Sequence, residues 1–184
     1  MDRYWLLTWT TYGTWLPGDP RGFVSAVDDG TGGAVIHNIS GTPFDADWHH
    51  LREYARSRLD GDPVLLDSQE ASIIADQLHE TARHRGWQLT SIAIMRNHIH
   101  VVIGVAGDPP PETLLRDFKS YASRALNQAL GFKAKRWTES GSRRRLKTDD
   151  AILSATAYVR DQKSPLVLWV DEKFIAEIGE RRNR

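Results

Sequence analysis

The chain has 184 residues, of which 40% are hydrophobic and 26% are charged, a composition typical of one soluble globular domain. Its 24 basic and 24 acidic residues give a formal net charge of zero, so the protein as a whole has no long-range attraction for nucleic acid. The absence of cysteine excludes disulfides, thiolate zinc sites and cysteine nucleophiles. The N-terminus does not resemble a signal peptide and no apolar run is long enough to span a membrane, so we expect a cytoplasmic protein.

The first predicted element is a strand over residues 3–11, which are rich in aromatic and branched side chains. Residues 12–61 are dense in Gly, Pro and Asp, and we interpret them as an insertion whose role the sequence leaves open. A short helix is expected within it, over 45–59. A longer helix is predicted over 68–84, where apolar side chains recur with helical spacing and Gly86 ends the helix.

The next predicted elements are two extended runs, 87–95 and 98–105, which have the pattern of a hairpin. Residues 112–130 follow as a helix with one apolar side. The end of the basic segment 135–148 is interpreted as a fourth strand, and 149–162 as a last clear helix.

This order of elements, β-α-β-β-α-β-α, predicts the fold class. Three or four antiparallel strands with helices on one face would form a ferredoxin-like, or RRM-like, α+β sandwich. We expect a single domain over 1–184, with the insertion at about 12–61 and a C-terminal tail at about 166–184.

Two histidines lie two residues apart in the apolar run 98–105. Because side chains alternate across a strand, His98 and His100 share one face while Ile99 points to the other. Neutral imidazoles suit manganese, cobalt, nickel and zinc, and magnesium if oxygen ligands complete the shell. The alternative is a pair of histidines on a solvated sheet face.

A second pair of polar residues lies in the last predicted helix. Tyr158 and Gln162 are four residues apart, so they share one helix face. A helix packed against the histidine face would bring the amide oxygen of Gln162 to a metal and the phenol of Tyr158 to the metal's ligand. Taken alone, such a Tyr is more often a packing residue and such a Gln more often solvated.

Together these motifs resemble the single-tyrosine HUH transposases, in particular the REP-associated tyrosine transposases. Their strand motif corresponds to "MRNHIHVVI" from Met95, and their catalytic-helix motif to "YVRDQ" from Tyr158. The segments "TWTTYGTWLPGDPRG" and "WTESGSRRRL" are also similar to segments of such relatives. The resemblance extends from near the start of the chain to about Gln162 and implies an HUH endonuclease type of fold.

The resemblance also implies a mechanism. Tyr158 would be the nucleophile, and Mg²⁺ or Mn²⁺ held by His98, His100 and Gln162 would polarise the scissile phosphate. Attack would leave a 5′-phosphotyrosine and a free 3′-hydroxyl, which allows later strand transfer without ATP. The implied substrate is single-stranded DNA, often beside a hairpin, and the relatives include monomers and homodimers.

Basic residues cluster just before the last helix. Seven positive charges lie between residues 133 and 147 against the single acid Glu139. We predict DNA contacts from six of them: Lys135, Arg136, Arg143, Arg144, Arg145 and Lys147. In an extended strand the three consecutive arginines alternate faces, so at least one would face the DNA. The alternative is an ordinary solvated basic run.

Other residues are given structural roles. Tyr121 competes as nucleophile, but Ala125 occupies the position four residues later and cannot bind a metal, so packing is favoured. His49 and His50 are interpreted as surface histidines. Trp5 and Trp9 lie on the same face of the predicted strand, and we favour core packing over base stacking for both.

Two other function classes remain open. One is a non-catalytic module that binds single-stranded nucleic acid on an RRM-like sheet. The other is a small metal hydrolase, which would want an acid near the histidines as general base, and the strand offers none.

Overall fold

The computed structural model describes residues 1–19, 25–28, 34–37 and 49–182. The chain divides into two compact units. One comprises Met1–Thr11 and Leu65–Arg184, and the other comprises Tyr12–Val64. The predicted start of the helix over 45–59 lies outside the described residues.

In the unit Tyr12–Val64, the described residues include a pair of short strands and a helix. Strand β2 (Ser25–Asp28) pairs antiparallel with β3 (Ala34–His37), and helix α1 covers His49–Ser57. Within this unit the Tyr12 hydroxyl accepts a hydrogen bond from the amide of Asp60 at 2.7 Å, and the Tyr12 carbonyl accepts one from the amide of Val64 at 2.9 Å. These bonds join the beginning of the unit to its end.

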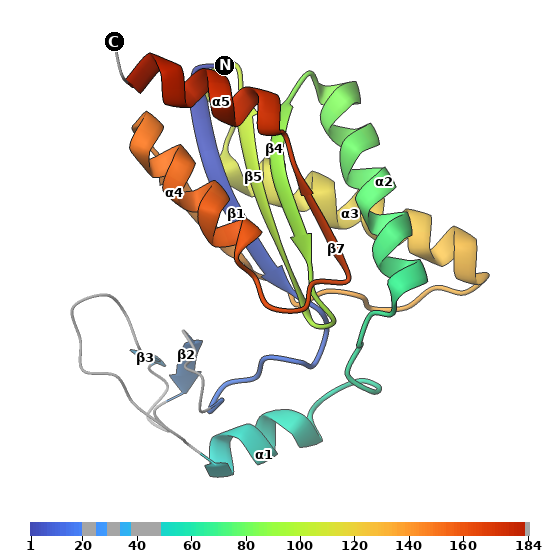
Figure 1. Cartoon of the computed structure of the whole chain (residues 1–184). Helices are drawn as coiled ribbons and strands as arrows, with labels where there is room; N and C mark the ends of the chain where they lie inside the picture. The colour runs from blue at the N-terminus through green and yellow to red at the C-terminus, as the bar shows by residue number, and fades with distance from the viewer. Residues whose placement is uncertain (20–24, 29–33, 38–48, 183–184) are drawn as a thin grey trace. The chain divides into compact units, whose positions relative to one another are not determined.

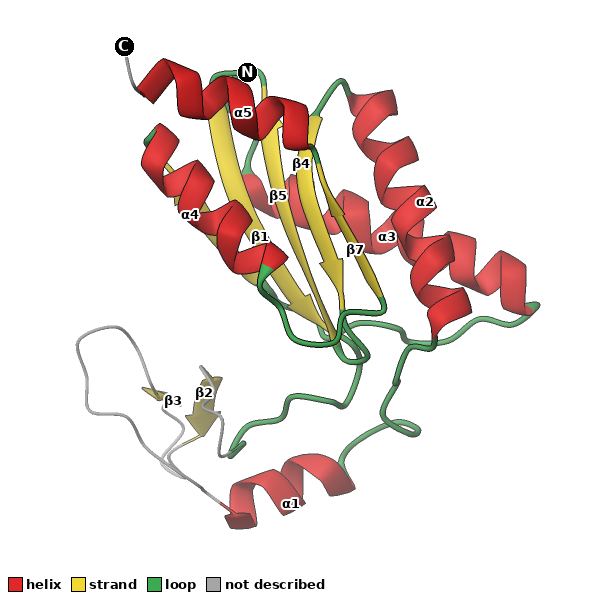
Figure 2. Cartoon of the chain, in the orientation of Figure 1, coloured by secondary structure: helices red, strands yellow, loops and turns green. Residues whose placement is uncertain are grey.

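The larger unit is built on a five-stranded antiparallel sheet of order β6-β1-β5-β4-β7 (Figures 1 and 2). Its strands are β1 (Arg3–Thr10), β4 (Gln88–Ile94), β5 (His98–Val105), β6 (Ser142–Leu146) and β7 (Val167–Val170). Strand β5 is central, since β1 and β4 pair with its two edges. The predicted α+β class and antiparallel sheet are confirmed.

Local sequence explains where the helices begin and end. Helix α2 (Ser68–Arg85) begins at a capping box, in which Asp67 accepts from the amide of Glu70 and Glu70 accepts from the amide of Asp67. It ends at Gly86, whose φ of 67° is the left-handed conformation that glycine adopts without strain. Helices α3 (Pro111–Leu130), α4 (Asp149–Arg160) and α5 (Glu172–Arg182) complete the unit.

The helices cover both faces of the sheet, so the prediction that they lie on one face is wrong. On one face Trp9 stacks on Phe118 of α3, with ring centroids 6.5 Å apart. On the other, Leu6 and Val102 pack against a cluster of buried side chains from α4 and α5 (Figure 1). Burial along β5 shows that both faces are covered, because the neighbours Val101 and Val102 are both fully buried although they point to opposite faces.

The segment 166–184, predicted as a tail, instead forms an edge strand and a helix up to Arg182. Strand β7 pairs with β4, with Val167 opposite Ile94. Helix α5 buries Phe174 and Ile178 in the cluster on the α4 face. In the part of the chain that the structure describes, no helix is both long and apolar enough to cross a membrane.

Candidate active site

Two histidines project from the central strand toward the face covered by α4. Val102 of β5 packs against α4, and His98 and His100 have the same parity in the strand, so they share that face. Their ring centroids are 4.8 Å apart with an interplanar angle of 79°. His100 is 4% exposed, whereas His98 is half-buried.

The surroundings of His100 favour its neutral form. Its Nδ1 lies 2.7 Å from the hydroxyl oxygen of Thr8, the residue opposite it on β1. Its Nε2 is buried and has no hydrogen-bond partner. Burial, and secondarily the neighbouring His98, lower the pKa of His100 to about 4. The ring is therefore neutral at physiological pH.

The ring of His98 is held by its neighbour in sequence. Nδ1 of His98 lies 2.7 Å from Oδ1 of Asn97. An amide oxygen accepts hydrogen bonds and cannot donate them, so Nδ1 carries the proton and Nε2 of a neutral ring has the lone pair. This role of the Asn97 side chain was not predicted from the sequence.

Helix α4 brings Tyr158 to the histidines. Thr148 caps its N-terminus through a bond from the Ala151 amide, and Ile152, Ala155 and Val159 bury its inner face. Tyr158 is 50% exposed, and its ring centroid lies 5.1 Å from that of His100 at an angle of 78°. The structure thus brings together three of the four residues expected in the site.

Gln162 lies just beyond the end of α4, which finishes at Arg160, two residues earlier than predicted. The chain turns here, with Asp161 as C-cap and Ser164 at a φ of 56° before Pro165. The side-chain nitrogen of Gln162 donates to the carbonyl oxygen of Tyr158 at 3.0 Å. This bond ties Gln162 to the residue next to the histidines and uses its nitrogen rather than its oxygen.

The donor set of this site fits a divalent cation. A buried imidazole nitrogen without a hydrogen-bond partner, as at Nε2 of His100, is costly unless something accepts its lone pair or its proton. Two adjacent imidazoles, in their neutral form, are good ligands for manganese and related ions, and an amide oxygen such as Oε1 of Gln162 suits magnesium.

Tyr121, the competing tyrosine, lies elsewhere. It is half-buried on α3, the helix that packs on the opposite face of the sheet. The guanidinium of Arg124 lies 5.2 Å from the centre of its ring.

The basic strand β6 divides its arginines between the two faces. Arg144 is opposite Leu6, which packs on the α4 face, so Arg144 shares the face of the histidines. Arg143 and Arg145 point to the other face, and Arg143 pairs with Glu112 at 3.3 Å. All three are exposed, as is Lys147 just beyond the strand.

Five basic residues, one of them Arg143 of β6, line a pocket of about 490 Å³ between α3 and the segment that leads into β6. Its cationic side chains are Arg116, Lys119, Lys135, Arg136 and Arg143. Arg136 is 5% exposed, pairs with Glu70 at 3.8 Å and lies over the ring of Phe132. It forms a wall of the pocket. Arg116 and Lys119 were not predicted from the sequence because only the fold brings α3 beside this segment.

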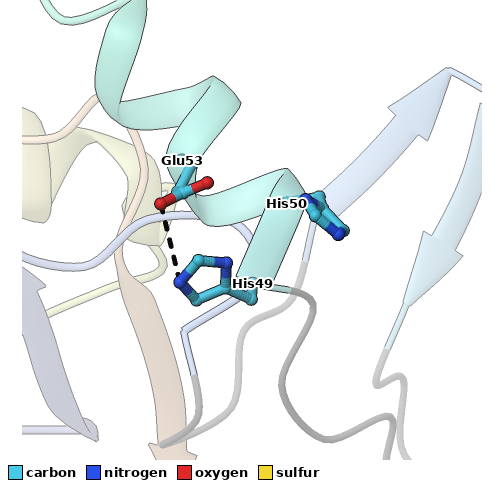
Figure 3. A group of neighbouring side chains, drawn as sticks. All are labelled: His49, His50 and Glu53. Carbon is cyan, nitrogen blue, oxygen red and sulfur yellow. Dashed lines mark ion pairs between the residues drawn. The ribbon is translucent and has the colours of Figure 1, made fainter.

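A separate group of ligand-type side chains lies on α1: His49, His50 and Glu53, all exposed. Figure 3 shows His49 and Glu53 side by side, joined by an ion pair of 3.5 Å, with His50 pointing away from both. One ligand atom of each residue lies within 4.8 Å of the other two, so the three side chains are close enough to share one ion. Their exposure agrees with the predicted surface role.

The family model described as "Transposase IS200 like" matches residues 63–162, more than half of the chain, and includes His98, His100, Tyr158 and Gln162. The chain belongs to the IS200-like transposase family. The family expected from the two motifs is therefore confirmed, and the antiparallel α+β unit with the two histidines on its central strand is the HUH type of fold.

Two solved structures resemble this IS200-like transposase. One is a REP-associated tyrosine transposase bound to a REP hairpin, with 11% identity and a TM-score of 0.46 over 84% of this chain and 63% of that one. The other is a protein of Deinococcus radiodurans assigned as a transposase, with 13% identity and a TM-score of 0.47 over 89% and 94%. This chain spans less than two thirds of the length of the first. No protein of curated function matches the sequence.

Proposed function

We propose that this transposase cleaves and rejoins single-stranded DNA through a covalent link to Tyr158. The observation that carries the proposal is the contact of Tyr158 with His100, whose ring centroids are 5.1 Å apart, beside a buried Nε2 without a partner. A nucleophile and an imidazole nitrogen without a hydrogen-bond partner thus lie side by side on one face of the sheet, with Tyr158 open to solvent.

In the proposed reaction the phenol oxygen of Tyr158 attacks a backbone phosphorus. A P–O bond to the tyrosine forms, the bond from phosphorus to the 3′-oxygen breaks, and the phenol proton is lost as the departing 3′-oxygen gains one. The products are a 5′-phosphotyrosine and a free 3′-hydroxyl. Attack by a 3′-hydroxyl of another strand reverses these steps and releases Tyr158, so the energy of the broken bond is conserved for joining.

Residues His98, His100 and Gln162 would hold Mg²⁺ or Mn²⁺ beside the reacting phosphate. Such an ion, when bound, neutralises charge that develops on the phosphate oxygens. The imidazoles contribute neutral nitrogen ligands, and Gln162 contributes its amide oxygen while its nitrogen remains bonded to the carbonyl of Tyr158.

We propose that DNA runs across the edge strand β6. Arg144, on the histidine face, would bind phosphates of the strand being cleaved. Flanking DNA, including a hairpin where one is present, would contact Arg143, Arg145 and Lys147 and the pocket formed with Lys135 and Arg136. Residues 12–61 are proposed to be an insertion in a single transposase domain.

The test is trapping of a covalent adduct. Labelled single-stranded DNA from the flanks of the gene is incubated with protein and Mn²⁺, and the products are separated on a denaturing gel. We expect an adduct with wild type and with Tyr121→Phe, and none with Tyr158→Phe, which loses only the attacking oxygen. An adduct that persists in Tyr158→Phe and disappears in Tyr121→Phe would move the nucleophile to α3. If the wild-type protein binds the DNA but forms no adduct, the alternative of a non-catalytic nucleic-acid-binding module would be favoured.

A further inference from the structure

Each histidine of the site has a side-chain oxygen close to the same ring nitrogen. Oγ1 of Thr8 lies 2.7 Å from Nδ1 of His100, and Oδ1 of Asn97 lies 2.7 Å from Nδ1 of His98. Both distances are at the short end of the range for such hydrogen bonds. In both rings Nδ1 is therefore the nitrogen that a neighbouring oxygen engages, which makes Nε2 the candidate ligand atom.

We infer that Thr8 and Asn97 are positioning residues, which fix the tautomer and orientation of His100 and His98 so that both Nε2 atoms offer lone pairs to one cation. The inference rests on the proposed function, in which the two histidines are ligands. Neither Thr8 nor Asn97 would touch the cation or the DNA. They would act through the two rings, as hydrogen-bond partners of metal-bound histidines commonly do.

For His98 the chemistry of the partner decides the tautomer. The amide oxygen of Asn97 is an acceptor, so it holds a proton on Nδ1. The backbone of Asn97 is fixed independently, because its carbonyl accepts hydrogen bonds from the amide and the hydroxyl of Thr11. A change confined to the side chain of Asn97 therefore removes this hydrogen bond to His98 and keeps the two bonds to the Asn97 carbonyl.

For His100 the register of the sheet decides the contact. Thr8 is directly opposite His100 in the β1–β5 ladder, between strands that are paired along their whole length. A threonine side chain has restricted rotation about χ1, which keeps its hydroxyl beside the ring. A hydroxyl can donate or accept, but a cation on Nε2 requires a proton on Nδ1, and Thr8 Oγ1 is placed to accept it.

The test uses paired variants. Thr8→Val removes the hydroxyl at nearly constant shape, and Thr8→Ser restores it. Asn97→Leu removes the amide oxygen, and Asn97→Asp restores an acceptor. Thr10→Val is the matched control, since Thr10 lies on the same strand face but its hydroxyl bonds Thr138 at 2.9 Å. Thermal denaturation selects the variants that keep the wild-type fold.

Two readouts are measured on these proteins. In the metal-free state, ¹⁵N NMR of the imidazoles should show the Nδ1–H tautomer for both rings of wild type and a mixture for His100 in Thr8→Val and for His98 in Asn97→Leu. In calorimetric titrations, Thr8→Val and Asn97→Leu should each bind Mn²⁺ about 10–100-fold more weakly than wild type does. Thr8→Ser, Asn97→Asp and Thr10→Val should bind at least nearly as well as wild type.

Wild-type tautomers and wild-type Mn²⁺ affinity in Thr8→Val and Asn97→Leu would overturn the inference, as would a loss that the conservative variants do not recover. Failure of the proposed function looks different. If His98→Ala/His100→Ala binds Mn²⁺ as wild type does, the two histidines are not the ligands. The tautomers of the metal-free protein still decide whether Thr8 and Asn97 orient the rings.

Discussion

Replacing Arg144 by Gln should weaken binding and cleavage of a short single strand, whereas Arg143→Gln and Arg145→Gln should not. The three residues have the same charge on the same strand and are all exposed. They differ in face: only Arg144 lies across the ladder from Leu6, on the side of His100 and Tyr158. Each variant removes one positive charge, so a difference in DNA binding among the three reports where the arginine lies rather than the net charge of the protein.

The magnitude follows from counterion release. One lost phosphate contact should lower the slope of log affinity against log salt by about 0.7 for single-stranded DNA. Over a fourfold increase in salt, that contact alone accounts for a factor of about 2.6 in affinity. The slope is measured by fluorescence anisotropy with a short labelled strand, and adduct formation is followed with subsaturating DNA. Equal slopes for all three variants, or no change in Arg144→Gln, would refute the assignment of faces. With a longer hairpin substrate, Arg143→Gln should also lower the slope.

Three further predictions concern the cation site, the pocket and the sheet. Gln162→Ala should lose adduct formation at low Mn²⁺ and regain most of it at high Mn²⁺. Gln162→Glu should bind the ion more tightly but form the adduct slowly. If both variants match wild type in a Mn²⁺ titration of adduct formation, Gln162 is not a ligand. Burial lowers the pKa of Lys119 from its usual 10.5 to about 8, so the unfolded chain holds more protons between these values and stability should rise with pH across this window. Urea denaturation should show that rise reduced in Lys119→Met and retained in Lys133→Met. In Gly104→Ala the new Cβ would lie 2.5 Å from the Tyr4 ring, which should lower the free energy of unfolding by about 1–3 kcal/mol, again measured in urea.

Local rules explain which parts of the site were predictable from sequence. The shared face of His98 and His100 follows from strand alternation alone, and helix α4 follows from its apolar spacing and its Thr148 cap. The pairing of Tyr158 with the histidines came from the family resemblance, because helical spacing does not say which sheet face a helix covers.

What the sequence did not reveal depends on strand register. Thr8 is 92 residues from its hydrogen-bond partner His100, and Arg144 is identified as the arginine on the histidine face only through its place opposite Leu6. Strand β7 was missed because its four residues form a strand only when they pair with the edge of β4, some 75 residues earlier. Such pairings are absent from any local pattern.

The central position of β5 gives the site one half on the sheet and one half on a helix. Its backbone is bonded to β1 and β4 on either side, so its amide protons should exchange with solvent only when the whole unit unfolds. Helix α4 has no ladder to hold it, and its last turn is tied to α5 by Arg160 and Glu172 at the surface. An adjustment that aligns the nucleophile with a phosphate would therefore involve α4 or the side chain of Tyr158, which is 50% exposed, while the imidazoles stay with the sheet.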